Sequence, residues 1–132
     1  MLTAVGYPGG MTEPSTEDII HEAIEVHRIL GPGLLEDIYD TCLCHRLAKA
    51  GMPVRRKVRI PLVFDGIRFA QSYVADIIVA DAIVLEIKSV ERLLPVHTAQ
   101  LRTYLRLSGC RVGLLLSSNE ILLKRGLRRV DL

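Results

Sequence analysis

Three ionisable side chains interrupt two apolar stretches that otherwise have the character of buried β-strands. Asp76 lies within residues 74–79, and Glu86 and Lys88 lie at the end of residues 82–88. Charges inside a buried strand are costly unless they pair or bind a metal ion. Two adjacent carboxylates repel each other, and a divalent cation such as Mg²⁺, which prefers oxygen ligands, would relieve that repulsion. Lys88 could then orient a water molecule or stabilise charge on a phosphate.

These residues alone leave a second interpretation open, in which Lys88 forms a buried ion pair with either acid and only holds the sheet together. Strand periodicity decides whether the two acids can meet. Glu86 and Lys88 share one face, and opposed residues in an antiparallel pair also share a face. A two-residue turn at Ala80-Asp81 would pair Asp76 with Leu85, on the wrong face. We therefore predict an odd-length loop or one bulge, which pairs Asp76 with Glu86.

The surrounding elements follow from periodicity and from Gly and Pro positions. Ser15 caps a first helix that Gly31-Pro32-Gly33 ends, and a second helix runs from about residue 34 to residue 50. Pro61 and the basic residues place the next strand at a sheet edge, and Asp65-Gly66 signals a hairpin turn. The later elements are a long, bent or bulged strand over 67–79, a strand over 82–88, a helix over 96–108, a central apolar strand over 112–117, and a tail over 121–132 that is a short strand or a frayed helix.

This order predicts an α/β or α+β fold in which helices cover a small mixed sheet. With 132 residues, 49% hydrophobic, the chain suits one domain over residues 15–132, preceded by a mobile tail over residues 1–14. Met11 is a possible natural start. The absence of a signal-peptide pattern and the odd count of 3 cysteines favour a reducing, cytoplasmic setting and free thiols over a cysteine metal site.

The second helix carries a candidate acid, Glu36. At 100° per residue Glu36 falls within the apolar arc that also contains Leu43 and Leu47, and we expect it to point inward. The alternative is an acid favoured by the helix dipole, which explains a Glu at this position but not an inward direction. Asp37 and Asp40 are expected to face outward as solvated acids.

The helix over 96–108 brings Gln100 and Tyr104 to one face, four residues apart. That spacing is compatible with simple packing as well as with a site, and His97 is either a phosphate contact or an ordinary polar helix start. Two clusters of basic residues are either the walls of a phosphate-binding groove or the solvated protection of an edge strand and tail. They comprise Arg55, Arg56, Lys57 and Arg59, and Lys124, Arg125, Arg128 and Arg129. The net charge of +2 does not decide between these interpretations.

The motifs together resemble a known group of proteins. Asp76 with Glu86-Ile87-Lys88 resembles the D…(D/E)-x-K core of the PD-(D/E)XK nuclease superfamily, although Ala75 stands where that core often has Pro. Gln100-Leu101-Arg102-Thr103-Tyr104 resembles the Q-x-x-x-Y motif of its exonuclease branch. Gly33-Leu34-Leu35-Glu36-Asp37-Ile38-Tyr39 resembles the signature of the GxxExxY family within the same superfamily. The resemblance covers roughly residues 15 to 132.

The resemblance implies a restriction-endonuclease-like αβββαβ core and Mg²⁺- or Mn²⁺-dependent hydrolysis of DNA or RNA phosphodiesters. By motif, Asp76, Glu86 and the carbonyl of Ile87 are metal ligands, and Glu36 is a helix-borne acid that completes the metal site. Asp76 and Glu86 are also catalytic, together with Lys88, which assists the attacking water. Gln100 and Tyr104, with His97, position the substrate, the backbone or Lys88. The alternatives are a catalytically silent nucleic-acid-binding or regulatory module that keeps the fold, and a structural homo-oligomer whose acids form only ion pairs. A homodimer is compatible with each.

Overall fold

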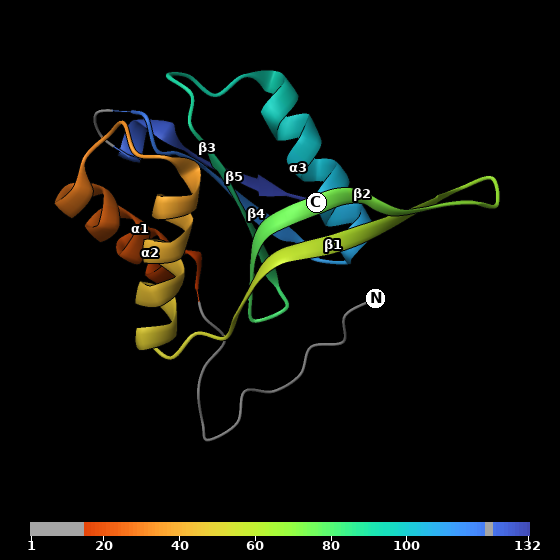
Figure 1. The fold of residues 1–132 in the computed structure, drawn as a ribbon, viewed down its shortest axis with the longest axis horizontal. Helices are drawn as coiled ribbons and strands as arrows, with labels where there is room; N and C mark the ends of the chain where they lie inside the picture. The colour runs from red at the N-terminus through yellow and green to blue at the C-terminus, as the bar shows by residue number, and fades with distance from the viewer. Residues whose placement is uncertain (1–14, 121–122) are drawn as a thin grey trace.

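The computed structural model describes residues 15–120 and 123–132, and the predicted mobile tail over residues 1–14 lies outside them. The order of elements in the described residues is the one predicted from the sequence (Figure 1). The elements are α1 (Thr16–Leu30), α2 (Glu36–Lys49), β1 (Val54–Phe64), β2 (Ile67–Val79), β3 (Ile83–Lys88), α3 (Pro95–Ser108), β4 (Val112–Ser117), the 3₁₀ turn η2 (Leu123–Gly126) and β5 (Leu127–Asp131).

The strands form one mixed sheet in the order β1-β2-β3-β4-β5. Only β3 and β4 pair in parallel, because α3 carries the chain back between them, and the other neighbours are antiparallel. The predictions of an edge position for β1 and a central position for β4 are confirmed. The tail, for which two structures were possible, ends as strand β5.

The β1–β2 hairpin extends beyond the body of the molecule (Figure 1). Its tip has the turn predicted from Asp65-Gly66, with φ of 48° and 80°, a pair of values that suits a two-residue hairpin loop. The irregularity predicted for the long strand β2 is also present. Ile60 and Leu62 of β1 are two residues apart, but they pair with Tyr73 and Phe69 of β2, which are four residues apart. Phe64, whose side chain is 68% exposed, lies at this tip rather than in the core.

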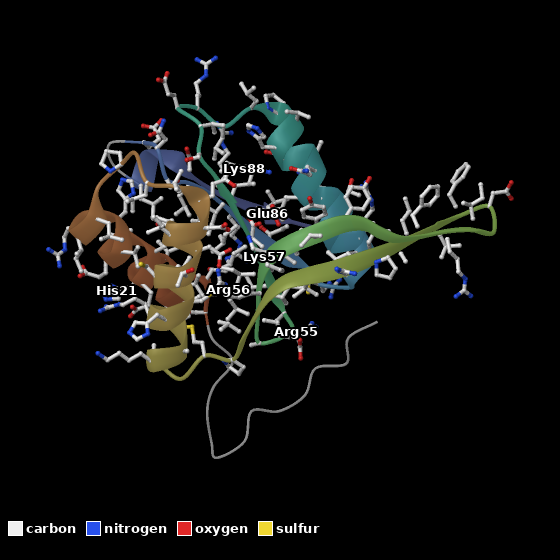
Figure 2. The ribbon with its side chains drawn as sticks, viewed as in Figure 1. His21, Arg55, Arg56, Lys57, Glu86 and Lys88 are labelled. Atoms are coloured by element: carbon white, nitrogen blue, oxygen red, sulfur yellow. The ribbon has the colours of Figure 1, made fainter. Side chains whose placement is uncertain are left out.

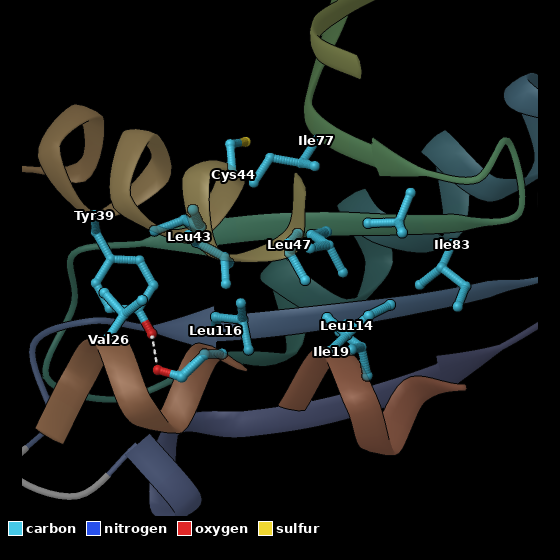
Figure 3. Close-up of a cluster of buried hydrophobic side chains, with 14 of the residues drawn as sticks. Ile19, Val26, Tyr39, Leu43, Cys44, Leu47, Ile77, Ile83, Leu114 and Leu116 are labelled. Atoms are coloured by element: carbon cyan, nitrogen blue, oxygen red, sulfur yellow. Dashed lines mark hydrogen bonds between the residues drawn. The ribbon is translucent and has the colours of Figure 1, made fainter. Parts of the chain in front are cut away.

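Two apolar clusters hold the helices against opposite faces of the sheet. The first joins α1 and α2 to the sheet through side chains such as Ile19, Leu43 and Leu114 (Figure 3). Within it, the buried Tyr39 hydroxyl donates a hydrogen bond to the carbonyl oxygen of Ala23, 3.0 Å away, and so ties α2 to α1. The second cluster joins α3 to the other face and contains Leu101, Leu105 and Leu115. The sheet therefore has α1 and α2 on one face and α3 on the other.

The helix ends follow the predicted capping residues. The Ser15 side chain accepts a hydrogen bond from the Asp18 N–H at the start of α1, and Gly109 ends α3 with φ of 80°, a left-handed value that Gly adopts without strain. Within the described residues, no helix combines the length and apolar character needed to cross a bilayer.

Candidate functional site

The β2–β3 connection has the odd length that the sequence required. Val79 pairs with Ile83, which leaves the three residues 80–82 in the loop, with Ala80 and Asp81 at φ of 53° and 54°. The register continues through Ile77↔Leu85. One further step along both strands places Asp76 opposite Glu86, so the prediction that the two carboxylates share a face is confirmed.

At the position where Asp76 lies opposite Glu86, the side-chain carboxylates accept the hydrogen bonds between β2 and β3. The backbone N–H of Asp76 donates to Glu86 Oε1 at 3.0 Å, and the backbone N–H of Ile87 donates to Asp76 Oδ2 at 2.8 Å. Each carboxylate therefore accepts a backbone hydrogen bond from the strand opposite its own. This reciprocal arrangement fixes both acids where β2 and β3 separate.

Burial makes the negative charge on this pair expensive. Glu86 is only 3% exposed, and burial, followed by repulsion from the Asp76 carboxylate, raises its pKa to about 8. Burial also raises the pKa of Asp76, although the Ile87 N–H and the ammonium groups of Lys57 and Lys88 oppose the rise. Two neighbouring acids whose pKa values are raised despite the two lysines beside them are suited to binding a cation.

Lys88 lies beside these two acids, and a hydrogen bond to helix α3 holds its side chain in place. Its Nζ donates to Gln100 Oε1 of α3 at 2.9 Å and lies 3.9 Å from Glu86 Oε2. Glu86 and Lys88 are close together in Figure 2, between the sheet and α3. One cluster therefore contains the acids of two neighbouring strands, Asp76 and Glu86. It also contains Lys88, two residues after Glu86, and Gln100 from the helix that follows.

A comparison with known protein families matches residues 13–130 to the PD-(D/E)XK nuclease superfamily. The chain belongs to this superfamily. The match confirms the restriction-endonuclease-like fold expected from the sequence, and the α+β architecture agrees with it. Comparisons with curated proteins and with solved structures gave no match. PD-(D/E)XK proteins are in general nucleases, act on nucleic acids and typically use divalent metal ions.

The PD-(D/E)XK acids of this chain fit one divalent ion of the magnesium type. In residues 15–120 and 123–132, no group of three or more His, Cys, Asp or Glu side chains is arranged to hold a metal ion. Mg²⁺, however, commonly takes one or two protein carboxylates and completes its shell with water and substrate phosphate. A third protein oxygen is available from the backbone, because the N–H and C=O of one strand residue point to the same side and the Ile87 N–H points towards Asp76. Asp76, Glu86 and the Ile87 carbonyl are therefore a chemically suitable set of ligands.

The expected inward direction of Glu36 is wrong. The helix begins at Glu36, whose side chain is exposed, and its Oε1 accepts the backbone N–H of Ser89 at 2.9 Å. Ser89 Oγ also donates to the carbonyl oxygen of Leu34 at 3.2 Å. The first turn of α2 thus holds the backbone immediately after Lys88, a contact across the end of β3 that a helical wheel does not contain.

The prediction that Asp40 is a solvated acid is also wrong. Its side chain is only 2% exposed, and its two oxygens are divided between Arg56 Nε at 2.7 Å and Lys57 Nζ at 3.5 Å. The side of α2 that carries Asp40 lies against the basic segment of β1, which supplies counter-charges that the helix sequence cannot show. Asp37 is 83% exposed, as predicted.

Lys57 is the residue nearest the acids that sequence reasoning did not assign to the site. Its Nζ lies 3.8 Å from Asp76 Oδ1, and Figure 2 shows it in the central region near Glu86. The pairs Arg56↔Ile77 and Val58↔Ala75 place Lys57 level with Asp76, and this register depends on the shift between Ile60 and Leu62, which the sequence does not locate. In the sequence, Lys57 is only one member of a basic cluster.

Of the other candidate residues on α3, Tyr104 lies near the acids and His97 lies at the start of the helix. Tyr104 is buried against Tyr73, with ring centroids 5.5 Å apart. Burial and then the charges of Glu86 and Asp76 raise the Tyr104 pKa to about 12, which places its hydroxyl in the field of the acids. His97 lies at the helix start, where its Nδ1 accepts the backbone N–H of Leu94 at 2.9 Å.

Several members of the two basic clusters are neutralised within the fold. Arg55 pairs with Asp81 at 2.8 Å, Arg56 and Lys57 pair with Asp40, and Arg129 pairs with Asp131 at 3.1 Å. The side chains of Lys124 and Arg125 lie outside the described part of the structure. The first cluster therefore stabilises the junction between α2, β1 and β2 as well as contributing positive charge.

Proposed function

We propose that this chain is a divalent-metal-dependent nuclease that hydrolyses phosphodiester bonds of DNA or RNA. The observation that supports this most directly is the reciprocal bonding of Asp76 and Glu86 across the separating ends of β2 and β3, with Lys88 beside them. An ion pair that only held the sheet would not leave the buried Glu86 and the half-buried Asp76 carboxylates next to each other with raised pKa values.

Asp76, Glu86 and the carbonyl of Ile87 would hold the ion. A bound Mg²⁺ or Mn²⁺ polarises a phosphoryl oxygen and lowers the pKa of a coordinated water. The protein's own contribution is to fix the two carboxylates before the ion arrives, since each already accepts a backbone N–H. Both acids therefore lose little conformational freedom on binding.

Lys88 would orient the attacking water and stabilise negative charge on the phosphate. Gln100 Oε1 accepts from its ammonium, so the amine is held in one direction rather than left to rotate. Glu36 would act by positioning, because its bond to the Ser89 N–H fixes the chain just beyond Lys88. Tyr104 would pack behind the acids and limit their access to water.

Within the superfamily, we propose the GxxExxY family as the nearest group for this chain. The Glu and the Tyr of that motif, Glu36 and Tyr39, make different contacts in this fold. Glu36 contacts Ser89 at the end of β3, and Tyr39 is buried and bonded to the Ala23 carbonyl of α1. The motif thus links the first layer of helices to the strand that bears Lys88.

The test is cleavage of a panel of single- and double-stranded DNA and RNA with EDTA, Mg²⁺ or Mn²⁺. We expect metal-dependent cleavage by the wild type and a loss of at least about 100-fold in Lys88→Met and Asp76→Asn, the size typical of removing a positioned proton-transfer or charge-stabilising group. Lys49→Met on α2 and Glu91→Gln, which change exposed charges away from the acids, are the matched controls. Equal cleavage by all variants would contradict the assignment, and metal-dependent binding without cleavage would favour the silent nucleic-acid-binding module.

A further inference from the structure

Lys57 lies in contact with three carboxylates at once. Its Nζ is 3.4 Å from Asp37 Oδ1, 3.5 Å from Asp40 Oδ2 and 3.8 Å from Asp76 Oδ1. These acids come from α2 and from β2, so one ammonium group on β1 joins three elements. Lys57 therefore shares its positive charge among three carboxylates instead of forming one isolated ion pair.

The oxygens of Asp76 are divided between two neighbours. Oδ2 accepts the N–H of Ile87 on β3, whereas Oδ1 is directed to Lys57 on β1. Asp40 is divided in the same way, with Oδ1 on Arg56 and Oδ2 on Lys57. Lys57 therefore links the buried Asp40 to the proposed metal ligand Asp76 through its positive charge.

We propose that Lys57 is a tethered cation that occupies the second cation position beside Asp76 and so limits the site to one divalent ion. The inference rests on the proposed function, because it takes Asp76 and Glu86 as metal ligands. Lys57 is a positioning residue: it acts through the Asp76 carboxylate and contacts neither substrate nor reacting atoms.

The charge of Lys57 sets the expected size of the effect. A dication bound by Asp76 and Glu86 would lie roughly 6 Å from the ammonium, and even with the full screening of water their repulsion weakens binding about tenfold. Full screening is the appropriate assumption because the Lys57 side chain is 49% exposed. Removing the charge while keeping the apolar stem should therefore tighten binding and free Asp37 and Asp40 for a second ion.

The experiment is a titration of metal-free protein with Mn²⁺, followed by isothermal calorimetry and by electron paramagnetic resonance. We expect one ion per wild-type chain. Lys57→Met should bind the first ion at least about tenfold more tightly and take a second, with the dipolar broadening of two nearby Mn²⁺ ions. Lys57→Arg, which retains the charge, should restore the wild-type stoichiometry. Arg55→Met is the matched control, because it removes a positive charge from the same strand where the partner is Asp81.

Folding of each variant is checked by its thermal transition, and Lys57→Asn is the second variant because Asn tolerates the φ of 50° found at this residue. The inference is overturned if the wild type binds Mn²⁺ while both neutral variants bind one ion equally well or more weakly. A wild type that binds no Mn²⁺ would contradict the proposed metal dependence. If the wild type binds no Mn²⁺ but Lys57→Met does, the result would still support Lys57 as a tethered cation. If neither the wild type nor Lys57→Met binds Mn²⁺, both the metal dependence and the tethered cation are overturned.

Discussion

The buried Glu86 carboxylate predicts a specific dependence of stability on pH. Its pKa rises from the ordinary value of 4.5 to about 8 in the folded chain, first through burial and then through repulsion from Asp76. Between these values the folded state binds more protons than the unfolded state, so the free energy of unfolding falls as pH rises through this window. At about 1.4 kcal/mol for each pH unit, the penalty above pH 8 is on the order of 4–5 kcal/mol.

Glu86→Gln should remove this penalty and keep the hydrogen bonds. The amide oxygen can still accept the N–H of Asp76, and the amide NH₂ can donate to the Asp76 carboxylate. We expect the variant and the wild type to have similar stabilities at pH 4, where the wild-type carboxyl is protonated. At pH 9 the variant should be more stable by several kcal/mol.

Urea unfolding followed by circular dichroism from pH 4 to pH 9 measures the difference directly. Glu91→Gln, which removes an exposed acid just beyond β3, is the control and should follow the wild-type curve. Mg²⁺ or Mn²⁺ at 100 times its dissociation constant should restore about 2.7 kcal/mol to the wild type at pH 9 and less to Glu86→Gln. Parallel curves for the wild type and Glu86→Gln at every pH would refute the reasoning.

Three further substitutions test the contacts that hold the site. Asp40→Asn leaves the Arg56 guanidinium facing a neutral amide and should cost about 2 kcal/mol by urea unfolding, whereas Asp37→Asn, at an exposed position, should cost less than about 0.5 kcal/mol. Gly113→Ala would place a Cβ 2.8 Å from Leu101 and push α3 away from β4, which should lower the unfolding free energy by about 1–3 kcal/mol in a thermal melt. Tyr39→Phe removes the bond to the Ala23 carbonyl and should cost about 1–2 kcal/mol, and an unchanged transition would show that this bond is not needed.

The local features of the fold were accessible from the sequence because short-range rules set them. Ser15 and Gly109 mark helix ends through the hydrogen bonds available at a terminus. Asp65-Gly66 sets a hairpin turn because both residues adopt positive φ. Two-residue periodicity likewise showed that Asp76 and Glu86 can share a face only with an odd-length loop or a bulge, and the β2–β3 loop has the odd length.

The surroundings of the acids depended on contacts between residues far apart in the chain. Glu36 and Ser89 are separated by 53 positions, and Lys57 and Asp40 by 17. A helical wheel gives the relative directions of side chains on one helix, but packing decides how that helix is rotated against the sheet. This is why Glu36 was expected to face inward and Asp40 outward, and why both expectations failed.

The sequence by itself determined that Asp76, Glu86 and Lys88 can share one face of a hairpin only if its loop has an odd length or a bulge, since the number of residues in a strand and its loop settles which side chains oppose each other. The three-residue loop of the structure meets that condition. Only the tertiary structure decided which groups surround them. It brought Gln100 to Lys88 across one face of the sheet, and Asp40 with Lys57 to Asp76 from the other helical layer. The physical reason is that electrostatic partners act through space, and the distance along the chain says nothing about which charge will neutralise a buried acid.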